Sequence, residues 1–253
     1  MTKPDYMTSP QGRKIAYYRT KGRGPGVVFL GGFRSDMTGT KAVFLQDWAA
    51  RQGRAFLRFD YSGHGQSSGN FLEGAIGDWF EDALAVLTLT TEPQVLVGSS
   101  MGGWIALLLA RAVPQRIAGL VGIAAAPDFT EDSMWANFSE RQRAEVIEKG
   151  QLATPSDYSA DPYIITRRLI EEGRRQLVLR SPLDLPFPVR LLQGADDVDV
   201  PPEVALRLFG HATGADIRLN LVKGADHRFS KPECLQLIAE TVADVLRGAA
   251  TGT

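Results

Sequence analysis

Val95-Leu96-Val97-Gly98-Ser99-Ser100-Met101-Gly102-Gly103-Trp104 is the most informative run of ten residues in the chain. It places a GxSxG pentapeptide between a short apolar run and the helix-like segment 104–110. Glycines on both sides of a serine permit the cramped strand-to-helix turn that exposes its hydroxyl at the end of a sheet. The pentapeptide alone is a weak signal, but this context predicts a nucleophile elbow. Ser100 is therefore the predicted nucleophile, and Ser99 is expected to be structural.

Apolar runs and helix-like segments alternate on both sides of this unit. Strands are predicted at 26–30, 55–59, 94–98, 118–124, 189–192 and 217–222, after an opening hairpin of 6–9 and 13–20. Helices are predicted at 38–51, 77–90, 101–113 and 202–209. Such alternation is typical of a mainly parallel sheet covered by helices on both faces. We therefore expect an α/β fold with eight strands.

The stretch between the sixth and seventh predicted strands breaks the alternation. It carries no strand signal, only helix-like segments such as 140–149 and 163–179. A gap of this length inside a compact domain is typical of a lid or another functional insertion. We therefore predict an α/β core formed by residues 1–126 and 189–253, with a helical cap, residues 127–188, inserted after the sixth strand.

The composition indicates an ordinary globular protein. Of the 253 residues, 44% are hydrophobic and 23% are charged, and the formal net charge of −1 creates no field that would attract nucleic acid. The single cysteine, Cys234, cannot form an internal disulfide, which favours a reducing compartment. No signal peptide, presequence or apolar run of roughly 20 residues is visible, so a cytoplasmic location without membrane insertion is expected. The tail 248–253 is expected to be irregular.

Serine hydroxyls need a general base, usually histidine, and the chain has three histidines. His211 falls just before a strand, at the amino edge of the sheet, whereas catalysis takes place at the carboxyl edge. His64 precedes the serine in the chain and lies in a turn-rich loop. His227 follows the last strand and comes in the order serine, acid, histidine that accompanies a nucleophile elbow. His227 is therefore the predicted base, and the other two are expected to be structural.

The acid that orients the histidine is expected in the loop after a neighbouring strand. The stretch Gly194-Ala195-Asp196-Asp197-Val198-Asp199-Val200-Pro201 offers three aspartates. Asp197 best matches the usual GxxDxxVP spacing, while Asp196 and Asp199 are expected to brace the turn. Asp128, which follows the preceding strand, is the alternative acid.

Acyl transfer also needs donors for the oxyanion of the transition state. Each such donor contributes roughly 10² to 10³ in rate. The predicted donors are the backbone amide of Met101, directly after the nucleophile, and that of Phe33, in the glycine-rich loop after an early strand.

Together, the order Ser100, Asp197, His227, the loop Gly31-Gly32-Phe33 and the turn Asp60-Tyr61-Ser62-Gly63-His64-Gly65 resemble α/β-hydrolases over nearly the whole chain. Closer stretches are similar to mitochondrial α/β-hydrolase-domain enzymes described as palmitoyl-protein thioesterases and acyl-glucuronide esterases: Gly39-Thr40-Lys41-Ala42, Arg58-Phe59-Asp60-Tyr61-Ser62-Gly63, Val97-Gly98-Ser99-Ser100-Met101-Gly102-Gly103-Trp104 and Asp226-His227-Arg228. The resemblance implies a serine hydrolase with its triad at these three positions. Two departures from those enzymes are that no presequence is visible and that the cap differs.

The predicted activity is hydrolysis of carboxylic esters or thioesters of acyl groups through an acyl-enzyme. The substrate is expected to be a small acyl ester or thioester, or an acylated protein, and no cofactor or nucleic acid is expected. Three dispersed histidines and one cysteine also predict no metal site. The alternatives are a small-ester or carbon–carbon-bond hydrolase of the same fold, and a catalytically silent ligand-binding protein.

Two groups of side chains in the predicted cap bear on the substrate. Trp135 and Phe138, with Phe129 and Met134, are the candidate lining of an acyl pocket, and packing within the cap is the alternative. Six arginines of the same segment could bind a carboxylate, or could simply form a solvated helix face: Arg141, Arg143, Arg167, Arg168, Arg174 and Arg175.

Overall fold

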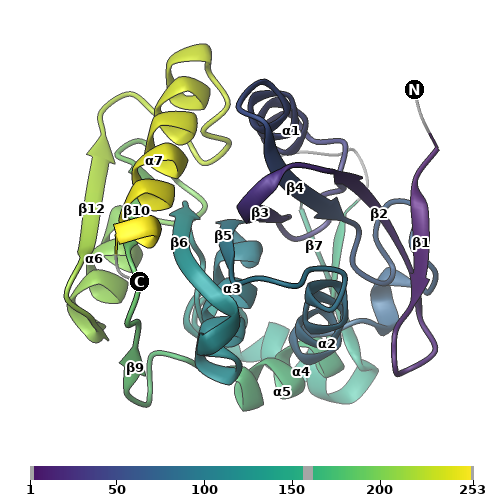
Figure 1. The fold of residues 1–253 in the computed structure, drawn as a ribbon. Helices are drawn as coiled ribbons and strands as arrows, with labels where there is room; N and C mark the ends of the chain where they lie inside the picture. The colour runs from purple at the N-terminus through teal and green to yellow at the C-terminus, as the bar shows by residue number, and fades with distance from the viewer. Residues whose placement is uncertain (1–2, 156–161, 252–253) are drawn as a thin grey trace.

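Eight strands form one sheet at the centre of the computed structural model, which describes residues 3–155 and 162–251 (Figure 1). Their spatial order is β1-β2-β4-β3-β5-β6-β10-β12. The pairs β1–β2 and β2–β4 are antiparallel, and the other pairs are parallel, so the predicted mainly parallel sheet is confirmed. The strands are β1 (Asp5–Thr8), β2 (Lys14–Thr20), β3 (Arg23–Leu30), β4 (Arg54–Phe59), β5 (Gln94–Ser99), β6 (Ile117–Ile123), β10 (Val189–Gly194) and β12 (Ile217–Val222).

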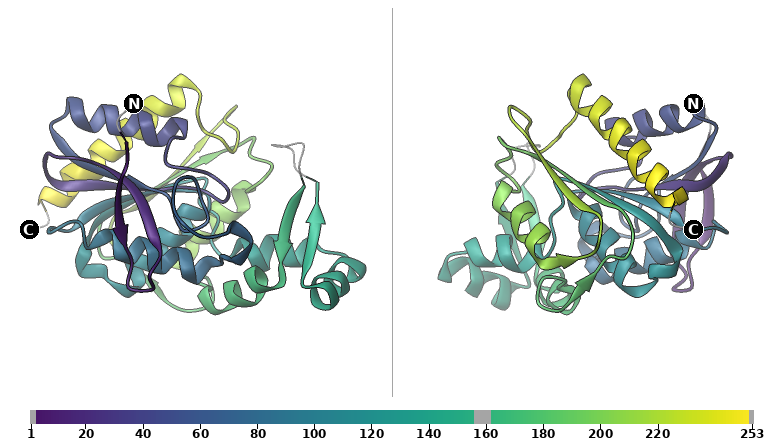
Figure 2. Two further views of the ribbon diagram at one scale, coloured as in Figure 1. Left: turned by 90° about the vertical axis from the view of Figure 1, so that its right-hand side faces the viewer. Right: turned by 60° about the vertical axis from the view of Figure 1, so that its left-hand side comes forward.

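Helices cover both faces of the sheet, as the two views of Figure 2 show. The first face carries α1 (Thr40–Arg51) and α7 (Pro232–Thr251). The other carries α2 (Ile76–Leu87), α3 (Met101–Ala112) and α6 (Pro202–His211). Strands buried on both faces need apolar side chains in both directions. Strand β5 meets this need, because Leu96 packs into one layer while Val95 and Val97 pack into the other.

Helix α7 was not among the predicted helices, and the expectation of an irregular tail from 248 is wrong as far as Thr251. The helix forms because its buried side chains recur at helical spacing and pack against the sheet. They are Cys234, Ile238, Val242, Val245 and Leu246.

Residues 127–188, which we call the cap segment, are not purely helical. The segment holds the π-helix η3 (Thr130–Trp135), α4 (Glu140–Lys149), the antiparallel strands β7 (Gln151–Thr154) and β8 (Tyr163–Thr166), α5 (Arg167–Gly173), the short 3₁₀ turn η4 (Arg174–Gln176) and β9 (Leu183–Asp184), which pairs with β11 (Ala212–Thr213). The remaining 3₁₀ turns are η1 (Phe71–Glu73) and η2 (Pro114–Arg116). The prediction of a strand-free insertion is therefore wrong.

The predicted helix 163–179 fails at its start for a local reason. Tyr163-Ile164-Ile165-Thr166 is rich in aromatic and β-branched residues, which favour a strand, and it pairs with β7. The side chain of Thr166 then accepts a hydrogen bond from the backbone amide of Leu169 and caps α5. The helix therefore begins only after this residue.

None of the helices in the described part of the chain is long and apolar enough to cross a membrane.

The sheet order has a direct consequence for function. The parallel strands β3, β5, β10 and β12 run in the same direction, so the loops that follow them meet at one edge of the sheet.

Candidate active site

Ser100 lies on a strained turn between β5 and α3. Its φ of 54° and ψ of −119° are unusual for a residue with a side chain. The turn exists because its glycines leave no room for a Cβ atom: one on Gly98 would lie 2.4 Å from the carbonyl oxygen of Gly102, and one on Gly102 would lie 2.1 Å from that of Leu30. This local geometry raises Ser100 above the end of the strand.

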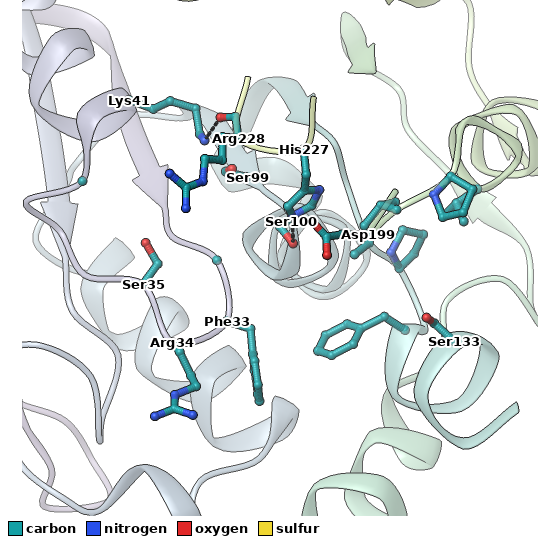
Figure 3. Close-up of a pocket in the computed structure, with 18 of the residues that line it drawn as sticks. Phe33, Arg34, Ser35, Lys41, Ser99, Ser100, Ser133, Asp199, His227 and Arg228 are labelled. Carbon is teal, nitrogen blue, oxygen red and sulfur yellow. Dashed lines mark hydrogen bonds between the residues drawn. The ribbon is translucent and has the colours of Figure 1, made fainter. Parts of the chain in front are cut away.

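Three predicted residues meet at the carboxyl edge of the sheet. Figure 3 shows two of them, Ser100 and His227, facing each other. His227, in the loop after β12, places Nε2 3.2 Å from Oγ of Ser100. Its Nδ1 lies 2.9 Å from Oδ2 of Asp197, in the loop after β10. With the proton on Nδ1, the ring donates to Asp197 and accepts from the serine hydroxyl. The arrangement is that of a serine activated by an oriented base.

Asp197 is buried and its carboxylate is fully engaged. Oδ1 accepts hydrogen bonds from the backbone amides of Asp199 and Val200, at 3.0 and 2.9 Å, and Oδ2 accepts from Gln193 as well as His227. Burial works against ionisation, but the hydrogen bonds from His227, Val200 and Gln193 outweigh it, so the pKa of Asp197 lies below its usual value. The acid is therefore held as a carboxylate.

Gln193, near the end of β10, is a site residue that the sequence reasoning missed. Its Nε2 donates to Oδ2 of Asp197 at 3.0 Å and to the carbonyl oxygens of Val200 and Gly194 at 2.8 and 3.2 Å. The side chain is fully buried. A signal was present, because a glutamine directly after the predicted buried strand 189–192 needs hydrogen-bond partners.

The other candidate acids lie elsewhere. Asp196 is exposed, and Asp199 contributes a backbone amide to Asp197. The alternative acid Asp128 is buried at the start of the cap segment, where it accepts hydrogen bonds from the backbone amides of Val178 and Leu179. The structure brings Asp197, and not Asp128, to His227.

The two remaining histidines have structural contacts. His211 lies 2.8 Å, through Nε2, from the carbonyl oxygen of Ser181. His64 is buried among the rings of Tyr61, Phe71 and Trp79, and burial lowers its pKa to about 4. Neither lines the cavity beside Ser100.

The predicted oxyanion donors flank the serine. A Cβ placed on Gly32 would lie 3.5 Å from Cβ of Ser100, so the loop that carries Phe33 runs directly beside the nucleophile position. Met101 begins α3, where the first backbone amides of a helix have no intrahelical acceptor. Within the described residues, no hydrogen bond involves the amide of Phe33 or Met101. Both amides are thus available to a substrate oxygen.

A cavity of about 740 Å³ opens beside Ser100 and His227. Its apolar wall is shared by the cap segment, the loop after β10 and the start of α6, through Phe129, Met134, Leu179, Val200, Pro201 and Val204. Trp135 and Phe138 do not line it, so the structure gives no support to their predicted contact with substrate. Their rings pack against each other instead, 6.2 Å apart.

The six cap arginines also lie outside the cavity lining. Arg168 pairs with Asp78, Arg174 with Glu131, and Arg167 with Glu171, all on exposed surfaces. Arg143 donates to the backbone carbonyls of Trp135 and Ala136. These contacts support the alternative reading of the arginines as surface and packing residues.

Among the described residues, one group could hold a metal ion: Asp197, Asp199 and His227, whose ligand atoms lie within 4.8 Å of one another. The hydrogen bonds to Asp197 already use both of its oxygens. A cation would have to displace the contact between Asp197 and His227. The donor set therefore fits an orienting carboxylate better than a metal ligand.

A parallel sheet of this order, with a serine on a strained strand-to-helix turn facing a histidine, defines the α/β-hydrolase class. The comparison with family models agrees, since the model described as serine aminopeptidase S33 matches residues 26–172. The chain belongs to this family of serine hydrolases and is an enzyme of that class.

Known proteins resemble the chain over almost its whole length. The rat mitochondrial palmitoyl-protein thioesterase ABHD10 is 37% identical over 98% of this chain and 84% of its own length. A crystal structure of a putative hydrolase from Agrobacterium vitis S4 is 42% identical, with a TM-score of 0.93, covering 96% of this chain and 98% of its own. The mouse α/β-hydrolase domain-containing protein 10 is 34% identical with a TM-score of 0.90, covering 97% and 99%. The predicted resemblance is therefore confirmed.

The expected cytoplasmic location stays a prediction. The rat relative is described as mitochondrial, which does not favour that expectation.

Proposed function

We propose that this hydrolase cleaves carboxylic esters or thioesters of acyl groups, with Ser100 as nucleophile, His227 as general base and Asp197 as the orienting acid. The observation that carries the proposal is the unbroken line of contacts from Asp197 through His227 to Ser100, of 2.9 and 3.2 Å, on the wall of a largely apolar cavity. Relatives named as thioesterases support ester or thioester substrates.

Acylation begins when Oγ of Ser100 attacks the carbonyl carbon and its proton passes to Nε2 of His227. The negative charge that develops on the carbonyl oxygen is stabilised by the amides of Phe33 and Met101. Asp197 stabilises the imidazolium without taking its proton. When the intermediate collapses, His227 gives the proton to the departing alcohol or thiol, and the acyl group remains on Ser100.

Deacylation repeats the sequence with water. Nε2 of His227 accepts a proton from the water molecule, whose oxygen attacks the acyl carbonyl. Collapse of the second intermediate returns the proton to Oγ of Ser100 and releases a carboxylic acid. The side chains of the chain itself suffice for each proton transfer.

Apolar lining favours a substrate with a hydrophobic acyl chain. A volume of 740 Å³ lies in the range of sites that enclose small organic ligands. The rat relative is named for palmitoyl-protein thioesters, so an acyl chain of that kind, on a small molecule or on a protein, is the substrate class we propose. An acyl glucuronide is the corresponding ester candidate.

The test is a kinetic panel of p-nitrophenyl esters of increasing chain length, an acyl thioester and an acyl glucuronide. Wild type is compared with Ser100→Ala and His227→Ala, and with the matched controls Ser99→Ala and His211→Gln. We expect the first pair to lose several orders of magnitude in kcat/KM and the controls to lose far less.

Undiminished activity of Ser100→Ala or His227→Ala would overturn the assigned roles. A wild-type protein that turns over no member of the panel would favour the catalytically silent binding protein. Turnover restricted to acetyl esters would favour the small-ester hydrolase of the same fold.

A further inference from the structure

His227 lies in a tight turn of residues 226–229, within the loop that joins β12 to α7. The backbone carbonyl of Asp226 accepts a hydrogen bond from the amide of Phe229 at 3.2 Å. This bond makes His227 and Arg228 the two central residues of a β-turn. The position of the catalytic imidazole therefore depends on the conformation of this turn as well as on its own hydrogen bonds.

The last residue of the turn has a strained backbone. Phe229 has a φ of 48°, in the left-handed region that residues with a bulky side chain rarely adopt. Such a conformation persists only where the surrounding structure over-determines it. The side chain of Phe229 is fully buried, and its amide also donates to Oδ1 of Asp226 at 3.1 Å. These contacts hold the first and last residues of the turn.

A contact from outside the loop reaches the middle of the turn. Nζ of Lys41 donates to the backbone carbonyl of Arg228 at 2.5 Å (Figure 3). This carbonyl belongs to the planar peptide unit that joins Arg228 to Phe229. A hydrogen bond to it restricts how that plane can rotate. The bond from Lys41 therefore restrains the turn directly beside His227.

The lysine itself starts from a fixed position. It lies in the first turn of α1, whose residues Ala42 and Leu45 are buried in the same apolar layer as Phe229. Close packing in such a layer leaves little freedom to the backbone of either element. The hydrogen bond of Lys41 therefore connects the turn 226–229 to a rigid part of the core.

Lys41 is a charged donor at neutral pH. Its side chain is partly buried, and burial lowers its pKa to about 8, while the nearby Asp226 raises the pKa and Arg228 lowers it further. The amine is therefore mostly protonated at pH 7. A hydrogen bond from a charged donor is roughly twice as strong as one between neutral groups. The bond to the turn thus belongs to the stronger kind.

We propose that Lys41 is a positioning residue of the active site, which holds the turn 226–229 so that Nε2 of His227 stays within reach of Oγ of Ser100. The inference rests on the proposed function and adds a residue that acts through His227. Proton transfer is sensitive to this placement, because a shift of about 1 Å can cost about 10²-fold in rate. The present distance of 3.2 Å is already at the long end of hydrogen-bond reach.

Lys41→Met tests this role, because it keeps an unbranched side chain of similar length and removes the donor. The substrate is p-nitrophenyl hexanoate, and thermal unfolding checks that each variant is folded. We expect kcat to fall by about tenfold and KM to change by less than about twofold. Lys41→Arg keeps a charged donor and is expected to recover most of the lost kcat.

Lys231→Met is the matched control. Nζ of Lys231 donates to the backbone carbonyl of Gly224 at 2.8 Å, so it makes the same kind of bond to the same loop, but outside the turn 226–229. Lys231 also lies outside the cavity lining. We expect its kcat to stay within about twofold of wild type. Equal losses in Lys41→Met and Lys231→Met would overturn the specific role of Lys41.

The kinetics of the remaining variants can also overturn the inference. A rise in KM at constant kcat in Lys41→Met would assign the lysine to substrate binding, because its side chain lines the cavity. A loss in Lys41→Arg as large as that in Lys41→Met would show that the donor is not the cause.

The rate of labelling by a fluorophosphonate separates this inference from the proposed function, because it reports the activation of Ser100 without an acyl substrate. We expect the second-order rate constant of Lys41→Met to be about tenfold below that of wild type. A rate equal to that of wild type would overturn the inference and leave the proposed function standing. No labelling of wild type would contradict the proposed function, and the inference with it.

Discussion

The catalytic edge of the sheet and the cap segment face each other across the cavity, but they are attached to the core in different ways. Ser100, Asp197 and His227 lie on turns that follow parallel strands of the sheet, so the paired strands fix their positions. The cap segment shares the apolar layer of α2 and α3 through side chains such as Leu169 and Val178, and polar contacts to the core add to this, such as the hydrogen bond from Nε1 of Trp104 to the carbonyl oxygen of Gln176. The difference teaches that the chemistry depends on the sheet, whereas the cap segment shapes the substrate side of the cavity.

The largest expected effect comes from the catalytic edge. Asp197→Asn keeps the shape of the side chain but removes the charge that stabilises the imidazolium and fixes its tautomer. We expect kcat to fall by about 10³- to 10⁴-fold with the fold intact, as measured by steady-state kinetics and thermal unfolding. A loss of less than tenfold would contradict the role of Asp197.

Loss of a buried contact in the cap segment should lower the stability of the protein rather than its catalytic rate. Asp128→Ala removes the acceptor of two buried backbone amides and the partner of Arg180, whose guanidinium lies 2.8 Å from the carboxylate. We expect the free energy of unfolding to fall by about 3 kcal/mol.

Denaturant unfolding measures this loss, and Asp132→Asn is the matched control, because Asp132 is partly exposed and pairs with Arg180 and Arg207 at the surface. Its loss should be about 1 kcal/mol or less. Equal losses of unfolding free energy in the two variants would contradict the claim that the buried contacts of Asp128 stabilise the protein more than the surface ion pairs of Asp132 do.

Substitution of Gln193 tests how precisely the side chain of Asp197 must be positioned for catalysis. Gln193→Leu removes one hydrogen bond to Asp197 but leaves those from Asp199 and Val200. We expect kcat to fall by about tenfold while KM stays nearly constant, because the residue positions the acid and does not touch substrate. A rise in KM at constant kcat would contradict this positioning role.

The smallest effect is expected at the apolar end of the cavity. Met134→Ala removes methylene contacts worth about 0.8 kcal/mol each from an acyl chain. We expect the preference for hexanoyl over acetyl p-nitrophenyl esters, measured as a ratio of kcat/KM, to fall by about fivefold. Trp135→Ala is the control, because Trp135 does not line the cavity. A drop of the same size in that variant would contradict the assignment of Met134, and not Trp135, to the cavity lining.

The same contrast explains what could be predicted from the sequence. Alternating strands and helices, together with chain order, place the loops of Ser100, Asp197 and His227 at one edge, and the structure brings these residues together. The role of Gln193 was not predicted, because it depends on a hydrogen bond between a strand residue and the following loop. Periodicity does not report such contacts.

The cap segment was harder to predict for a physical reason. Short elements such as β7 and β8 depend on pairing with each other, which local propensity indicates only weakly. Trp135 and Phe138 were predicted to contact substrate from their residue type alone, yet their packing turns them away from the cavity. The direction in which a side chain points depends on tertiary contacts that spacing does not contain.

Labelling with a fluorophosphonate, followed by peptide mass spectrometry, tests the central claim most directly, because the reagent marks a serine activated by a neighbouring base. We expect one phosphonate per chain, at Ser100 in the tryptic peptide of residues 59–111, and its loss in both Ser100→Ala and His227→Ala. Labelling at Ser99, undiminished labelling of His227→Ala, or no labelling of wild type would contradict an activated serine at this site.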